Sequence, residues 1–271
     1  MASPLPPELP SLQGDSQDGG RMSFFEHLAE LRKRLIYSVI AILVGTVIGL
    51  TFARDAYGVI ARPMLAALRE AHLEERLIYT SPTGAINLIL KLAVYIGFVL
   101  ASPVVLYQVW MFIAPGLYKH ERRAAGLFIF SSVSLFLAGI AFCYFVLLPY
   151  TLRFLVGFNT VYFTPFISIN EYWDLVLILM LGLGLVFQTP ILIFFLALFG
   201  IVTPAFLWKN FRYAILVIAI VAAIVSPTPD ALTMFIFMAP MVALYVLGIG
   251  VAAVVVRRKR RADAVARQGA D

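Results

Sequence analysis

Two glutamates in this sequence stand where a carboxylate could bind a guanidinium group. Glu30 lies on the polar face of a segment whose apolar residues recur at helical spacing, and Glu121 stands among basic residues just after an aromatic stretch. The planar fork of an arginine donates two parallel hydrogen bonds to a carboxylate, a geometry that lysine does not reproduce. Two such carboxylates on neighbouring elements could therefore bind two adjacent arginines of a guest peptide.

Each glutamate also has a simpler explanation within the chain. Glu30 and Arg34 are four residues apart, which on a helix surface gives an ion pair worth about 0.2–0.5 kcal/mol. Glu121 lies between Lys119 and Arg122 and could neutralise either of them. Spacing alone leaves these alternatives open.

The composition defines the medium in which these residues lie. Of the 271 residues, 62% are hydrophobic and 13% are charged, and the mean hydropathy is +0.92. Soluble domains carry about 25% charged residues, and a soluble globule this apolar would aggregate. The composition excludes a soluble enzyme and a nucleic-acid-binding protein, despite the net charge of +6. It predicts an all-α integral membrane protein.

Apolar runs of membrane-spanning length predict six transmembrane helices. The spans are expected at about 35–53, 88–110, 124–148, 175–199, 213–226 and 232–256. They form one membrane domain, 23–256, between a disordered N-terminal extension, 1–22, and a basic cytoplasmic tail, 257–271. The run from 154 to 170 contains proline and asparagine, so it is expected to be an interfacial loop.

Prolines inside the spans predict bent helices. Pro103, Pro190 and Pro240 favour a concave wall of helices over a closed bundle. Only about 14 residues, roughly 21 Å of helix, separate Arg212 from Pro227, so the fifth span is short. The sixth is interrupted by Pro240, and both spans are therefore expected sites for partner helices.

The charge distribution predicts that both termini lie in the cytoplasm. Most of the 21 lysines and arginines fall on the side that six spans assign to the termini, as the positive-inside rule requires. The three tryptophans, Trp110, Trp173 and Trp208, fall at predicted membrane–water interfaces. Before the first span, Ser23 and Glu26 fit a capping box that begins an amphipathic helix at the membrane surface.

Three stretches resemble TatC, the core subunit of the twin-arginine protein translocase. They are HLAELRKR from His27, VLYQVWMFIAPGLYKHERR from Val105, and SPTPD from Ser226. The resemblance extends from about Ser23 to Val256. It implies a receptor and scaffold for the twin-arginine signal peptides of folded cargo, in the bacterial cytoplasmic membrane and driven by the proton-motive force. The implied partners are TatA- and TatB-like single-span subunits, further copies of the chain itself, and membrane lipid.

The resemblance also implies roles for individual residues. Glu30 and Glu121 become the candidate contacts for the two signal-peptide arginines. The surrounding recognition surface would consist of Arg32, Phe112, Leu117, Tyr118, Lys119, His120 and Arg122. Pro63, expected as the first residue of an external helix 63–73, and Asp230, in the last external loop, are structural positions.

Two residues depart from the family pattern. Gln188, in the fourth span, and Gly84, in an external loop, stand where family members often carry an acidic residue. A glutamine hydrogen-bonds inside a membrane but holds no charge, so any contribution by ionisation is absent or moved. The alternative is that Gln188 only hydrogen-bonds a neighbouring helix. Gly84 weakens the case for a polar link between the external loop and Gln188.

A small secondary transporter is the alternative function. It would need ionisable groups at mid-membrane, whereas Lys91, Asp174 and Asp230 lie near span ends. An enzyme is not expected, because the spans contain no serine–histidine dyad, histidine pair or aspartate pair. A single cysteine, Cys143, and three widely spaced histidines also predict no metal site and no cofactor.

Overall fold

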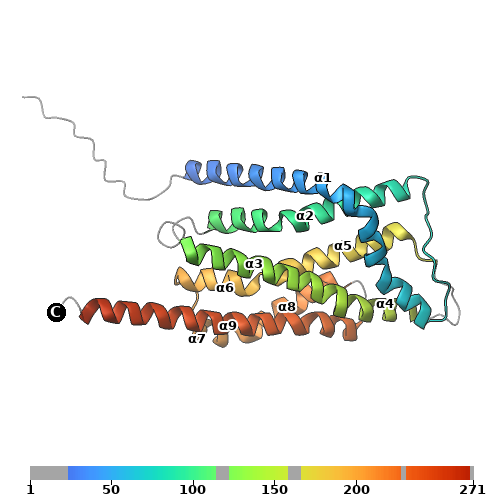
Figure 1. The fold of residues 1–271 in the computed structure, drawn as a ribbon. Coiled ribbons are helices and arrows are strands. Elements are labelled where there is room, and N and C mark those ends of the chain that lie inside the picture. The colour runs from blue at the N-terminus through green and yellow to red at the C-terminus, as the bar shows by residue number, and fades with distance from the viewer. Residues whose placement is uncertain (1–23, 114–121, 158–165, 227–229, 269–271) are drawn as a thin grey trace, which may run out of the picture.

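The computed structural model describes residues 24–113, 122–157, 166–226 and 230–268, and these ranges are mainly helical (Figure 1). The helices are α1 (Phe24–Glu70), α2 (Gly84–Ile113), α3 (Arg122–Phe142), the π-helical turn η2 (Cys143–Leu147), α4 (Leu148–Gly157), α5 (Ile169–Val186), α6 (Thr189–Leu198), α7 (Pro204–Lys209), α8 (Phe211–Val225) and α9 (Ala231–Gln268). Within the described residues, five helical stretches are long and apolar enough to cross a membrane, and α8 is a sixth, shorter apolar helix. The chain is an all-α membrane protein.

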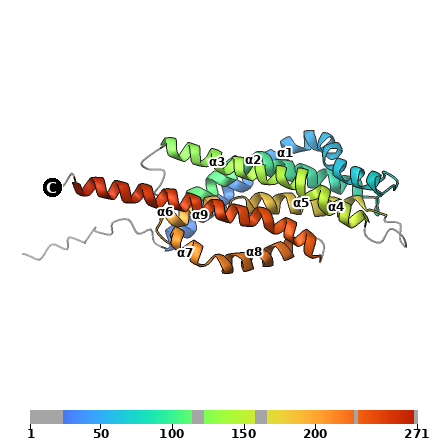
Figure 2. The same cartoon turned by 90° about the horizontal axis from the view of Figure 1, so that it is seen from below.

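The helices pack in an open series rather than a closed ring. Helix α1 contacts α2 and α4, α2 contacts α3 and α5, and α3 contacts α5, whereas α6, α7 and α8 contact α9. Figure 1 shows α8 and α9 on the opposite side of the molecule from α1, and Figure 2 shows α8 along one edge. The start of α1 and the end of α9 lie at the same end of the molecule (Figure 1), which we call the terminal side. The opposite end, where α1 ends and α2 begins, is called the far side.

Several helix boundaries differ from the prediction. Helix α1 continues through Pro63, so this proline lies inside a 47-residue helix rather than at the start of a separate one. The fourth span is broken at Phe187 and Gln188 into α5 and α6. Helix α9 continues past Val256 through the basic segment to Gln268, and its apolar part is of full membrane length. Residues 1–22 and the middle of the predicted loop 154–170 lie outside the described ranges.

Hydroxyl groups compensate for three of the prolines in the helical segments, Pro63, Pro103 and Pro190. A proline has no N–H, so the carbonyl four residues earlier lacks its helical donor, and in lipid that loss is costly. In two helices the residue just before the proline supplies the replacement. The bonds are Ser102 Oγ to Val99 O, 2.7 Å, before Pro103, and Thr189 Oγ1 to Val186 O, 2.6 Å, before Pro190.

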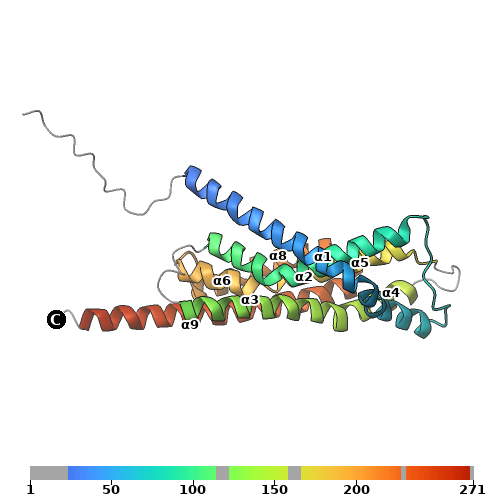
Figure 3. The same ribbon diagram turned by 45° about the horizontal axis from the view of Figure 1, so that its top comes forward.

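At Pro63 the replacement comes from other helices. The hydroxyl of Tyr144, in η2, donates to Val59 O at 2.7 Å, and Val59 is four residues before Pro63. The hydroxyl of Tyr172, in α5, donates to the next carbonyl, Ile60 O, at 2.6 Å. Both donors are distant in sequence, and α1 continues through Pro63 as one helix. Figure 3 shows that α1 changes direction along its length.

Small residues form the crossing of α1 and α2. Gly45 and Gly49, one helical turn apart on α1, face Ala93 and Gly97, one turn apart on α2. A Cβ at Gly45 would lie 2.5 Å from the carbonyl oxygen of Gly97. This is the small-xxx-small packing by which membrane helices approach closely.

The three tryptophans differ in their exposure. Trp208 is 63% exposed, but Trp110 is only 4% exposed and Trp173 is fully buried. Trp173 belongs to the largest apolar cluster, which joins α1, α2, η2, α4 and α5 and also includes residues of α8 and α9. The rings of Trp110 and Trp173 therefore pack between helices.

Candidate functional site

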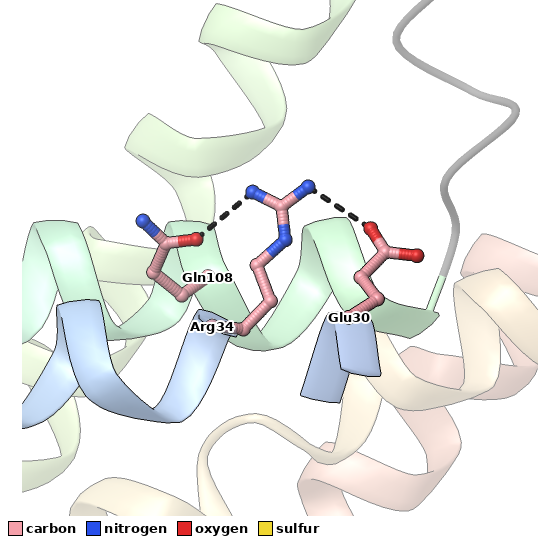
Figure 4. A network of polar contacts seen from close by, with 3 residues as sticks. All are labelled: Glu30, Arg34 and Gln108. Carbon is pink, nitrogen blue, oxygen red and sulfur yellow. Dashed lines mark hydrogen bonds and ion pairs between the residues drawn. The ribbon is translucent and has the colours of Figure 1, made fainter. Parts of the chain in front are cut away.

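The predicted acidic residue Glu30 lies on α1 at the terminal side, in a short polar chain that links α1 to α2 (Figure 4). Glu30 Oε1 accepts a hydrogen bond from Arg34 Nη2 at 3.0 Å, and Arg34 Nη1 donates to Gln108 Oε1 of α2 at 3.0 Å. The two charged side chains are only 16% and 21% exposed. The intrahelical ion pair, one of the alternatives for Glu30, is therefore present and is held by a residue of the second span.

The chain of contacts leaves hydrogen-bonding capacity unused. Glu30 Oε2 and Arg34 Nε are both buried and have no hydrogen-bond partner among the described residues. Beside them, the ring of His27 stacks on Phe112 of α2, with 4.4 Å between ring centroids. An unsatisfied carboxylate oxygen next to an aromatic pair is a site prepared for a further donor.

The structure describes only part of the predicted recognition surface. Phe112 is half-buried against His27, and Arg32 is exposed on α1. Arg122 is the first residue of α3. Leu117, Tyr118, Lys119, His120 and Glu121 lie outside the described residues. The segment that contains them begins directly after α2, whose last turn carries Phe112.

Sequence reasoning missed Gln108, although a signal was available. A lone glutamine within an apolar run is costly unless it finds a hydrogen-bond partner, so such a residue indicates a contact with another helix. Gln108 is 9% exposed, and its partner is Arg34.

A second polar chain lies inside the membrane region around Gln188. Trp110 Nε1 donates to Ser132 Oγ at 2.9 Å, and Ser132 Oγ donates to Gln188 Oε1 at 2.6 Å. Gln188 Nε2 in turn donates to the carbonyl of Ser132 at 3.0 Å. The glutamine therefore hydrogen-bonds α3, which was one of the two alternatives considered for it. The chain borders a cavity of about 240 Å³ lined mainly by apolar residues of α2, α3 and α6.

The far side holds the predicted structural residues. Asp230 Oδ1 accepts from Thr233 N at 2.7 Å and so caps the start of α9. Gly84 is buried at the start of α2, where a Cβ would lie 2.7 Å from Asn170 Nδ2 of α5. The 18 residues of α5, roughly 27 Å of helix, separate this point from Gln188. A direct polar link between Gly84 and Gln188 is therefore excluded.

Ion pairs join the far-side elements. Lys91 of α2 pairs with Asp174 of α5 at 2.5 Å, and Arg69 pairs with Glu75 at 2.7 Å. Hydrogen bonding from the Arg69 guanidinium lowers the pKa of the Glu75 carboxyl. Among the described residues, no group of three or more histidine, cysteine, aspartate and glutamate side chains is arranged to hold a metal ion.

An open series of apolar helices, with one acidic–arginine site at the terminal side and one neutral polar chain in its interior, defines a multi-pass membrane protein. Residues 26–240 match the family model of the Sec-independent protein translocase protein TatC. The chain belongs to the TatC family, a component of the Sec-independent protein translocase.

Individual relatives cover almost the whole chain. A TatC from Koribacter versatilis is 49% identical over 92% of this chain and 92% of its own length. A TatC from Aquifex aeolicus is 37% identical over 88% of this chain and 98% of its own length. A crystal structure of the twin-arginine translocase receptor TatC superposes with a TM-score of 0.73 at 37% identity, covering 85% of this chain and 100% of that one.

Proposed function

We propose that this chain is the receptor that binds the twin-arginine motif of signal peptides for the translocase. The observation that carries the proposal is the state of Glu30. Its side chain is only 16% exposed, one carboxylate oxygen is held by Arg34, and the other oxygen has no partner among the described residues. A guest guanidinium at Glu30 Oε2 would satisfy that oxygen.

Glu121 is proposed as the contact for the second arginine. It immediately precedes α3, in the segment that begins beside Phe112 and the His27 ring. Arg32, Phe112, Leu117, Tyr118, Lys119, His120 and Arg122 are proposed to shape the surrounding surface. A basic surface around two carboxylates restricts binding to guests that bring arginines to those two points.

The proposed setting is the bacterial cytoplasmic membrane with both termini in the cytoplasm. The positive-inside rule supports this orientation, because the basic segment after Val256 continues from α9 at the terminal side. The proposed partners are TatA- and TatB-like single-span subunits and further copies of the chain. Helix α8 supports a partner site, since it is only 15 residues long and only Ala222 on it is fully buried.

The test is direct binding of a labelled twin-arginine signal peptide to the purified full-length protein in detergent. The comparison is a twin-lysine version of the same peptide. We expect at least about tenfold tighter binding of the arginine peptide, equivalent to about 1.4 kcal/mol. Glu30→Gln and Glu121→Gln should each remove that margin, because an amide does not pair with a guanidinium as a carboxylate does.

Glu75→Gln is the matched control, since it removes a carboxylate from the far side only. Equal affinity for the two peptides, or loss of the margin in the control as well, would contradict the proposal. A secondary transporter predicts instead solute uptake into protein-containing vesicles without any peptide.

A further inference from the structure

A cavity of about 260 Å³ lies on the far side, between the last part of α1 and α4. Two helix faces form it. On α1, Arg62, Ala66 and Glu70 follow one another at four-residue spacing, and Phe145, Pro149 and Arg153 do so on the segment from η2 to α4. Four-residue spacing places each set on one side of its helix, so the two faces oppose each other.

Two irregularities of the backbone create the space. Pro63 removes a backbone hydrogen bond from α1, and opposite it the chain makes the π-helical turn η2. The Tyr144 hydroxyl of that turn donates to Val59 O, which fixes the two irregularities against each other. Single π-helical turns of this kind occur frequently at functional sites.

The cavity has an excess of positive charge. Arg153 binds Glu70 through both carboxylate oxygens, with Nε–Oε2 at 2.6 Å and Nη2–Oε1 at 2.8 Å. Arg62 takes part in none of the ion pairs found among the described residues. The charged residues that line the cavity are two arginines, Arg62 and Arg153, and one glutamate, Glu70, so its net charge is +1. Arg153 also keeps N–H donors that Glu70 does not use.

The opening of the cavity is apolar and faces the membrane region. Phe145 is 73% exposed, and η2 lies within the third membrane-length stretch, Phe128–Gly157. Phe145 and Arg153 are eight residues apart on one helical segment, so an apolar surface leads along about 12 Å of helix to the guanidinium groups. The cavity is too small for a whole lipid but is continuous with a surface on which an acyl chain can lie.

We propose that this cavity binds the phosphate-containing headgroup of an anionic glycerophospholipid from the far-side leaflet. Arg62 and the free donors of Arg153 hold the phosphate, Glu70 keeps Arg153 in place, and the acyl chains leave across Phe145. Free inorganic phosphate would use the same arginines but would gain nothing from the exposed Phe145. The site is separate from the Glu30 site, which lies at the terminal side.

A photo-crosslinker in place of Phe145 reports which lipid occupies the opening. The full-length Phe145→benzoylphenylalanine protein is reconstituted in nanodiscs of phosphatidylglycerol and phosphatidylethanolamine, and the lipid adducts are identified by mass spectrometry. An arginine near a membrane surface contributes enough to enrich the anionic lipid about fivefold over its bulk ratio. Arg62→Gln should return the adducts to the bulk ratio, and Arg62→Lys should keep most of the enrichment.

Arg69→Gln is the control, because it removes a far-side arginine that lies outside the cavity. The proposal would be overturned if the protein with Phe145→benzoylphenylalanine alone gave lipid adducts at the bulk lipid ratio. It would also be overturned if the enrichment of the anionic lipid persisted after Arg62→Gln. A competition experiment distinguishes a lipid headgroup from free phosphate as the bound anion. The crosslinking is repeated in buffer that contains inorganic phosphate and in buffer that contains chloride at the same ionic strength. Enrichment that persists in phosphate supports a lipid site, and enrichment abolished by phosphate shows a site for free anions instead.

Discussion

The crossing of α1 and α2 allows a test in which the structure sets both the sign and the size of the effect. Helix α1 carries three glycines, Gly45, Gly49 and Gly58. A Cβ at Gly45 would lie 2.5 Å from the Gly97 oxygen, and one at Gly49 would collide with the backbone of Ala93. A Cβ at Gly58 would meet nothing within 4 Å.

All three alanine substitutions gain helix propensity, but only two of them introduce a steric clash. Alanine is preferred to glycine inside a helix by about 0.8–1.0 kcal/mol, and this gain applies at each position. Overpacking against a backbone that does not yield costs about 1–3 kcal/mol, and it applies only at Gly45 and Gly49. We therefore expect Gly58→Ala to stabilise slightly and Gly45→Ala and Gly49→Ala to fall about 1–3 kcal/mol below it.

The single cysteine provides the assay. Cys143 is fully buried, so a thiol-reactive fluorophore reports its exposure as the protein unfolds in detergent on heating. At about 2–4 °C per kcal/mol, Gly45→Ala should unfold roughly 2–12 °C below Gly58→Ala. Equal unfolding temperatures for the two variants would refute the close-packing argument. A loss at Gly58 as large as that at Gly45 would refute it as well.

Three further substitutions test other contacts by the same thermal assay. Ser132→Ala leaves Trp110 Nε1 and Gln188 Oε1 without a partner, so we expect a loss of about 1–3 kcal/mol, whereas Thr51→Val, at an exposed hydroxyl, should change little. Tyr144→Phe should cost about 0.5–1.5 kcal/mol, and clearly less in the Pro63→Ala background, where a restored N–H donates to Val59 O; equal costs in both backgrounds would contradict the assignment. Asp230→Ala should cost about 1 kcal/mol by removing the cap of α9, and Asp230→Asn, which keeps an oxygen acceptor, should recover most of it.

The spans were predictable because each depends on local composition. Uninterrupted apolar runs located every membrane-length helix, and the short distance between Arg212 and Pro227 predicted the short α8. The prediction failed at Pro63, where the sequence shows a helix-breaking residue but not the distant tyrosines that compensate for it. The burial of Trp110 and Trp173 between helices could not be read from the sequence for a related reason, since burial is a property of the packing.

The candidate site was predictable only in part. Sequence spacing indicated the Glu30–Arg34 pair, and the structure has it. Gln108, which holds Arg34 from 74 residues away, could not be assigned, because nothing local identifies its partner. The same holds for Ser132, one of many small residues in an apolar helix until Trp110 and Gln188 are placed beside it. The roles of Glu30 and Glu121 in binding remain predictions.

The hydroxyls that replace proline N–H groups also bear on the order in which the protein is assembled. Ser102 lies in the same helix as its acceptor, and Thr189 lies in the same span as its acceptor Val186, so α2 and the α5–α6 segment enter the lipid with those carbonyls already satisfied. The Val59 carbonyl in α1, which loses its helical donor to Pro63, obtains a replacement from Tyr144 of η2, which is synthesised later. The first helix to be made therefore has this carbonyl satisfied only after the third span has arrived. Until then, this point of α1 depends on water or on an insertion factor.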